Sequence, residues 1–179
     1  MGLNFVIDPE LTGALQTEII GCWTDVSNAD GAVGFVPPVS TDDVRPVAEH
    51  DFAGAAAGRD RLIVARTAGG GADAAEGRLA ALAFIVDGQF GLTQHWRTVK
   101  RVMVHPDFQG LGYGVELMSE VARVGREMGL QMLQLECRGD TGNDLFYKKC
   151  GYIECGRLPR GLRISETDYR DVISLYLPL

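Results

Sequence analysis

The chain has 179 residues, 46% of them apolar, and a formal net charge of −7 with a pI near 4.9. This length fits one domain, so we treat residues 1–179 as a single unit. The acidic balance disfavours a nucleic-acid-binding face, which is usually basic, and is compatible with a cationic substrate. No stretch approaches the roughly 18 apolar residues of a membrane span. The first residues show no basic segment followed by an apolar one, so we expect a cytoplasmic protein.

Cysteine usage predicts neither a disulfide framework nor a metal site. None of the four cysteines forms a C-x-x-C pair, and no cysteine–histidine cluster has the spacing of zinc ligands. In a chain without a secretory signal we therefore expect free thiols and no bound metal. The cysteines are Cys22, Cys137, Cys150 and Cys155.

The N-terminal third of the chain predicts two helices. Residues 9–23 carry apolar side chains at helical spacing, with Asp8 as the expected N-cap. A loop rich in glycine and proline follows. A second helical pattern covers residues 40–58, with Thr41 or Asp42 as its cap.

A change of hydrophobic period then predicts three strands, over residues 61–67, 78–86 and 97–105. The glycine-rich turn over 68–77 predicts that the first two strands form a hairpin. The third strand alternates and then becomes fully apolar, which is typical of a central strand, and Pro106 ends it.

The rest of the chain predicts a long helix, a strand, a short helix and two final strands. The long helix, over 110–128, carries a wide apolar stripe. The later elements cover residues 130–137, 143–150, 152–159 and 171–179. A polar loop over 160–170 is expected between the last two strands. The order predicts a mixed α/β domain of the α+β type, in which 97–137 forms a right-handed parallel crossover.

A glycine-rich loop, "HPDFQGLGYG", joins the predicted central strand to the long helix. Such a loop presents free backbone N–H groups at the positive end of a helix, which suits a phosphate. The P-loop signature is absent, and the dinucleotide fingerprint fails because Val115 stands where its last glycine is required. A third pattern, Q/R-x-x-G-x-G/A, is matched in full by Gln109, Gly112 and Gly114.

The segment "VMVHPDFQGLGYGVELM" resembles the acetyl-CoA-binding motif of the GNAT superfamily of acyl-CoA N-acyltransferases. The resemblance extends to "LQLECRGDTGNDLFYKKCGYIECGRLP" and covers roughly residues 60–178. It implies a mixed, mostly antiparallel sheet with a central parallel strand–helix–strand crossover and helices on both faces. It also implies acetyl-CoA as co-substrate, with no metal, and acetyl transfer by direct attack of a primary amine in a ternary complex.

A second resemblance is to the tabtoxin-resistance type of acetyltransferase. It rests on "GAVGFVP", "FYKKCGYIECGRLP" and the tail "RDVISLYLPL". It points to a small-molecule acceptor, such as an antibiotic or a toxin. The sequence leaves open a protein N-terminus or a lysine as acceptor, and also a non-catalytic acyl-CoA sensor.

The GNAT resemblance implies a set of coenzyme A contacts. Backbone N–H groups of the glycine loop would hold the pyrophosphate, and a main-chain N–H of Met103 or Val104 would stabilise the carbonyl oxygen. The loop residues are Gln109, Gly110, Leu111, Gly112, Tyr113 and Gly114.

At the positions that transfer protons, the chain matches the family pattern only in part. Tyr147 stands where the family often has a tyrosine that protonates the leaving thiolate; the alternative is that it only packs against coenzyme A. The strand before the glycine loop carries no carboxylate. We expect Glu136 on the next strand to act as base through an ordered water, with His95 as the alternative. Each also has a plain structural interpretation, as a solvated strand or loop residue.

The family builds its acceptor pocket from the N-terminal helices with the loop between them and from the loop before the last strand. In this chain those segments are residues 21–38 and 159–171. Candidate lining residues, which could equally be core residues, are Trp23, Asp25, Phe35 and Trp96. Edge strands near the C-terminus leave room for pairing into a homodimer.

Overall fold

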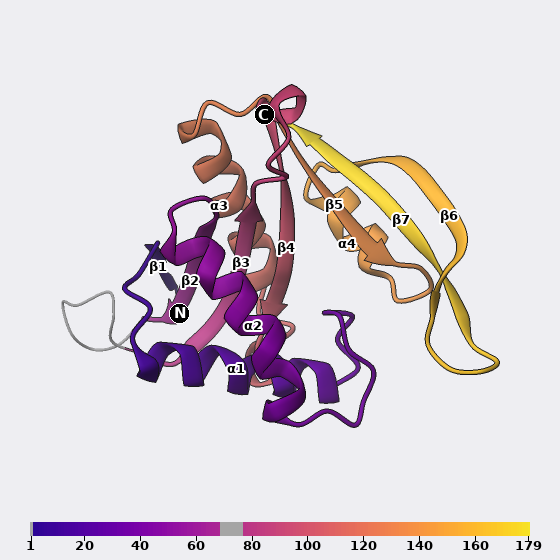
Figure 1. Cartoon of the computed structure of the whole chain (residues 1–179), viewed down its shortest axis with the longest axis horizontal. Coiled ribbons are helices and arrows are strands. Elements are labelled where there is room, and N and C mark those ends of the chain that lie inside the picture. Colours follow the sequence, from indigo (N-terminus) through magenta and orange to yellow (C-terminus); the bar gives the residue numbers. More distant parts are fainter. Residues whose placement is uncertain (1, 69–76) are drawn as a thin grey trace.

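The computed structural model describes residues 2–68 and 77–179, so most of the predicted turn over 68–77 lies outside the described residues. Seven strands form one sheet in the order β1-β2-β3-β4-β5-β7-β6 (Figure 1). The strands are β1 Leu3–Ile7, β2 Arg61–Thr67, β3 Leu79–Val86, β4 Trp96–Val104, β5 Met132–Arg138, β6 Ile153–Arg163 and β7 Tyr169–Pro178. The helices are α1 Gly13–Asn28, α2 Thr41–Ala56, α3 Tyr113–Glu127 and α4 Asn143–Lys149. No helix among these is long and apolar enough to cross a membrane.

The predicted fold class is confirmed. Each pair of neighbouring strands is antiparallel except β4 and β5, which are parallel and are joined through α3 as the predicted crossover. Helices α1 and α2 cover one face of the sheet, and α3 covers the other (Figure 1).

Strand β3 shows why both faces are buried. Its sequence "LAALAFIV" is apolar throughout, as expected for a strand covered on two sides. Leu82 and Phe84 pack into the cluster under α1 and α2, whereas Ala81, Ala83 and Ile85 face α3 and its neighbours. The small alanine side chains let α3 approach this face closely.

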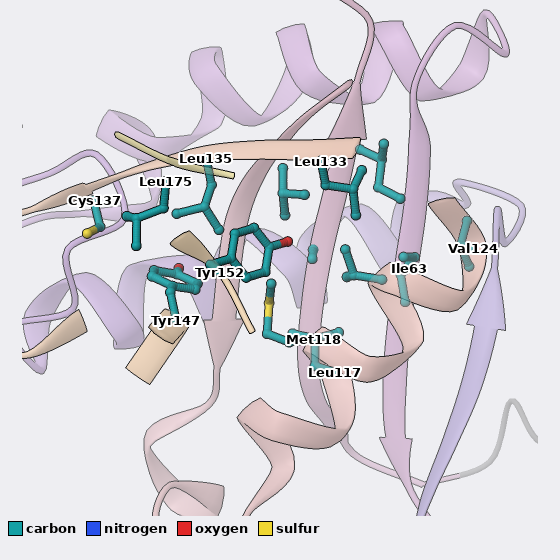
Figure 2. Packing of buried hydrophobic residues seen from close by; sticks show 14 of the residues in the cluster. Ile63, Leu117, Met118, Val124, Leu133, Leu135, Cys137, Tyr147, Tyr152 and Leu175 are labelled. Carbon is teal, nitrogen blue, oxygen red and sulfur yellow. The ribbon is translucent and has the colours of Figure 1, made fainter. Parts of the chain in front are cut away.

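The cluster under α3 and α4 also contains aromatic residues from the C-terminal half. Figure 2 shows Tyr147 and Tyr152 among Leu135, Leu175 and Met118. The hydroxyl of Tyr152 is buried there and has no hydrogen-bond partner among the described residues. A buried hydroxyl without a partner destabilises the folded state.

Three features of the N-terminal region differ from the prediction. Strand β1 was not predicted, although Leu3, Phe5 and Ile7 alternate along it and pack against the cluster under α3, and the strand pairs with β2. Helix α1 is capped by Thr12, because Asp8 has a φ of 51° and instead accepts a hydrogen bond from the Leu62 N–H. Helix α2 is capped by Ser40 in a reciprocal capping box with Asp43, rather than by either of the predicted residues.

The predicted loop over 160–170 was also mostly wrong. Strand β6 continues to Arg163, and only residues 164–168 remain between β6 and β7. The register shifts between Leu158 and Leu162, where Arg160 has a φ of 56°, so an irregular and polar stretch still pairs. Strand β6 forms an edge of the sheet, and the expected pairing into a homodimer stays a prediction.

We expect Tyr152→Phe to leave the free energy of unfolding unchanged or to raise it by about 1 kcal/mol, because it removes an unpaired buried hydroxyl. Urea denaturation measures this directly. A loss of more than about 1 kcal/mol would show that the hydroxyl has a partner in solution.

Candidate active site

The site begins where strands β4 and β5 separate. They pair only from Trp96 to Thr98, opposite Met132 to Gln134. Beyond that point, β4 carries a bulge against β3. Lys100 pairs with Phe84 and Met103 with Leu82, so two residues of β4 face Ala83 alone. A bulge bends its strand and redirects its edge, which accounts for the loss of pairing with β5.

Arg101 lies at this bulge with a φ of 54°, a left-handed conformation that is unfavourable for a residue with a side chain. Its Nε lies 2.9 Å from Oδ2 of Asp51 on α2, whose side chain is only 10% exposed. Its guanidinium stacks on the Trp23 ring of α1, 4.6 Å from the centroid. These contacts offset the backbone strain and tie the bulge to both N-terminal helices.

Three adjoining cavities follow the separation of the two strands. The loop cavity, of about 520 Å³, lies against the glycine loop and α4. The central cavity, of about 460 Å³, lies between β4 and β5 and shares Val102 and Tyr147 with the loop cavity. The outer cavity, of about 260 Å³, shares Glu136 with the central one and reaches the loop between β6 and β7.

The glycine loop presents a row of free backbone donors to the loop cavity. Among the described residues, no acceptor takes the N–H groups of residues 110–114, and the first backbone bonds of α3 begin at Val115 and Glu116. Gly110 and Gly112 have φ values of 77° and 84°, which favour glycine. The row therefore fits a phosphate group.

Two other loop residues have supporting roles. The side-chain amide of Gln109 donates to the Val104 carbonyl at 3.2 Å, so it fixes the loop to β4. A Cβ on Gly114 would lie 3.2 Å from the Phe146 ring, so α4 packs closely against the start of α3. The side chain of Leu111 is exposed.

The two predicted oxyanion donors differ in direction. The N–H of His105 bonds to Ala80 on β3, and peptide groups alternate along a strand, so the N–H of Val104 points away from β3 toward the cavities. By the same alternation the N–H of Met103 points to β3. The Met103 side chain is 1% exposed and packs under α1 and α2. The geometry thus favours Val104.

Tyr147 lies on α4 at the junction of the loop cavity and the central cavity. Its ring packs edge-on against Phe146 at 5.1 Å and Tyr152 at 5.9 Å between centroids (Figure 2). Burial raises the pKa of its phenol above the ordinary value, so the hydroxyl is protonated at neutral pH. That hydroxyl bonds to no other described residue, which leaves its proton available to a ligand.

Glu136 lines both the central and the outer cavity. It alternates with Leu135 and Cys137, which face the core, so its carboxylate lies on the cavity side of β5. The hydroxyl of Ser174 on β7 donates to this carboxylate at 3.2 Å. The structure therefore places Glu136 and Tyr147 on the walls of one cavity.

The remaining candidates lie outside the three cavities. His95 and Trp96 lie at the end of β4 that remains paired with β5, and His95 is exposed there. We therefore discard His95 as a base. Trp23 is fully buried and donates to the Val33 carbonyl, and Asp25 points outward beside His105.

Phe35 also packs against Trp23 rather than into a cavity, but the loop that carries it does line the site. Ala32, Val33 and Gly34 border the cavities, as does Arg163 from the second predicted segment. Residues of both predicted segments, 21–38 and 159–171, thus border the cavities, whereas the named aromatic residues Trp23, Phe35 and Trp96 do not.

Sequence reasoning missed two site residues. Arg101 is marked by its bulge, which depends on the register of β3 and cannot be seen in β4 alone. Arg138 borders the outer cavity, and its place two residues after Glu136 on the same face of β5 was a usable signal. Among residues 2–68 and 77–179, no group of three histidine, cysteine or acidic residues could hold a metal ion.

Comparisons with known proteins bear on the family and the fold of the chain. A family model described as an acetyltransferase (GNAT) domain matches residues 58–154. No curated protein matches. Solved structures with a similar fold include a protein of Acinetobacter baylyi described as an acetyltransferase, with 19% identity, a TM-score of 0.77, and coverage of 100% of this chain and 95% of that one.

Two further structures are similar over nearly their whole length. One is yncA of Salmonella typhimurium, solved with its cofactor acetyl-CoA, with 18% identity, a TM-score of 0.73 and coverage of 98% and 94%. The other is a chimeric spermidine N-acetyltransferase from Vibrio cholerae, with 16% identity, a TM-score of 0.73 and coverage of 98% and 95%. At these identities the likeness shows the fold.

We expect Gly112→Asp to weaken acetyl-CoA binding at least tenfold, about 1.4 kcal/mol, because it adds a negative charge and a strained backbone beside the free N–H row. Calorimetric titration measures the affinity. Gly129→Asp is the matched control, since Gly129 has a similar φ of 72° and open space around it at the other end of α3. Equal losses in both variants would contradict a phosphate site in the loop.

Proposed function

Because the chain belongs to the GNAT family of acetyltransferases and uses acetyl-CoA as co-substrate, we propose that it acetylates the primary amine of a small molecule by direct attack in a ternary complex. The observation that carries the proposal is the meeting of Glu136 and Tyr147 in the central cavity, next to the free N–H row of the glycine loop.

The residues present fit coenzyme A. Residues 110–114 offer backbone donors to the pyrophosphate, and the separated strands leave an unpaired edge on β4 for the amide groups of the pantetheine arm. On this path the arm would lead from the loop cavity past Tyr147 into the central cavity. When bound, acetyl-CoA supplies the acetyl thioester.

The reaction forms a C–N bond between the amine and the carbonyl carbon and breaks the C–S bond. The amine must first lose a proton, since an alkylammonium has a pKa of about 10.4. The carbonyl oxygen gains negative charge as the bond forms, and the sulfur leaves as a thiolate that takes up a proton. The site therefore needs a proton acceptor, an oxyanion donor and a proton donor.

Three groups of the chain supply these roles. The backbone N–H of Val104 faces the cavities and stabilises the oxyanion. The Tyr147 hydroxyl, which is protonated at neutral pH, borders both cavities and donates to the thiolate. The Glu136 carboxylate holds the ammonium and draws its proton through a water, since Glu136 borders both the central and the outer cavity.

The size of the outer cavity supports a small acceptor. It has a volume of about 260 Å³, which suits a small molecule, and it lies between the loop before α2 and residues Leu162, Arg163 and Ile164. The carboxylate of Glu136 in the adjoining wall favours an enzyme over a sensor that only binds acyl-CoA.

We expect Tyr147→Phe to lower kcat by about 10²-fold while changing the affinity for acetyl-CoA little, because the ring packing is kept and the proton donor is lost. Thiol release and calorimetry measure the two quantities. Tyr152→Phe is the matched control, since it removes a hydroxyl from the neighbouring ring, which borders none of the three cavities. An unchanged kcat in Tyr147→Phe would leave Tyr147 with a packing role only.

We expect Glu136→Gln to lower kcat/KM by about 10²-fold at pH 7, and the difference from the unmodified enzyme to shrink as the pH approaches 10. At high pH the amine is already neutral and needs no base. The pH profile of kcat/KM measures this, with Glu49→Gln, an exposed residue of α2, as control. A constant ratio across the pH range would remove Glu136 from proton transfer.

A further inference from the structure

We propose that the acceptor carries an anionic group, a carboxylate or a phosphate-type oxyanion, within a few bonds of its amine, and that Arg138 and Arg163 bind this group. The proposal rests on the proposed function, because it assigns the outer cavity to the acceptor. It concerns the substrate class and not the acetyl transfer itself.

The first observation is a reversal of charge. The chain has a net charge of −7, yet the central and outer cavities are bordered by four cationic residues and by Glu136 as the one acidic residue. Arg101 is neutralised by Asp51. No described carboxylate lies within ion-pair distance of the other three, Lys100, Arg138 and Arg163.

This pattern is unusual for the rest of the chain. Cationic side chains elsewhere are commonly paired, as Arg66 is with Glu18 and Arg157 is with Glu154. Unpaired cations in a concave site raise the local concentration of anions. The acidic composition is compatible with a cationic substrate, but the local positive charge at the cavities favours an anionic group.

The second observation is that Arg138 has hydrogen-bond donors without acceptors. Its guanidinium donates to the Phe35 carbonyl at 3.2 Å, while its buried Nε has no acceptor among the described residues. A guanidinium is always charged and presents donors in a planar fork that matches an oxyanion. The Nε is closed off from the cavity, but no described residue accepts from Nη1, so this end of the guanidinium has free donors beside the outer cavity, where Arg163 is also placed.

The third observation is spacing. Glu136 and Arg138 are alternate residues of β5, so both side chains project from one face of the strand with their Cβ atoms about 7 Å apart. One wall thus offers a carboxylate to an ammonium and, one step farther from the thioester path, a guanidinium to an anion. A compact zwitterion satisfies both groups, whereas a polyamine such as spermidine would meet unpaired positive charge.

The test uses the full chain with acetyl-CoA and a thiol-release readout. The acceptors are the L-amino acids, their C-terminal amides, the matching amines without the carboxylate, O-phosphoethanolamine and spermidine. We expect an anion-bearing amine to give a kcat/KM at least 100-fold above that of its neutral counterpart. Comparing the L-amino acids with O-phosphoethanolamine shows whether the site prefers a carboxylate or a phosphate group.

Variants then assign the preference to the residues. We expect Arg138→Gln and Arg163→Gln each to raise KM for the anion-bearing amine about tenfold or more and to leave KM for its neutral counterpart nearly unchanged. Arg126→Gln, an exposed and unpaired arginine on α3, is the control. Because Arg163 is exposed, its variant is informative even where Arg138→Gln fails to fold.

Failure of the inference can be distinguished from failure of the proposed function. Turnover of neutral amines or spermidine as fast as of anion-bearing amines would overturn the inference and leave the proposed function standing. A preference for anion-bearing amines that survives in both arginine variants would also overturn it. Turnover of no amine in the panel, with acetyl-CoA bound, would overturn the proposed function and the inference with it.

Discussion

The separation of β4 from β5 is the constraint on which the rest of the site depends. These are the central parallel strands, and a fully paired ladder would leave no room between them. The bulge at Arg101 ends the pairing, and Asp51 and Trp23 hold that arginine in its left-handed conformation. The N-terminal helices thus do more than cover the sheet, because they stabilise the irregularity that opens it.

Strand β5 separates the apolar core from the cavities. On β5 the odd-numbered residues Leu133, Leu135 and Cys137 belong to the apolar cluster beneath α3, and the even-numbered residues Gln134 and Glu136 border the cavities. The apolar row anchors the strand by burial, so the polar row is held on a rigid element. The side chains of β5 to which we assign a role in acetyl transfer therefore need little further ordering when substrates bind.

The sequence predicted the features that depend on local pattern, and it did not predict features that depend on pairing between segments far apart in the chain. The strand–glycine loop–helix order, Tyr147 on its short helix and the outward face of Glu136 follow from periodicity and spacing. The bulge at Arg101 depends on the register with β3, which no local pattern reveals, whereas β1 was missed although its short sequence "LNFVI" alternates. His95 has suitable chemistry for a base, but it lies at the paired end of β4, away from the cavities, and the sequence alone does not reveal that position.

The most direct test of the account is to record the backbone amide NMR signals of the protein while acetyl-CoA is added. The account predicts large shifts for the amides of Val104 and residues 110–114, which point into the loop and central cavities, and small shifts for Met103 and for the paired segment 96–98. Shifts centred on the paired segment, or none in the glycine loop, would contradict the claim that the opening between β4 and β5 binds the co-substrate.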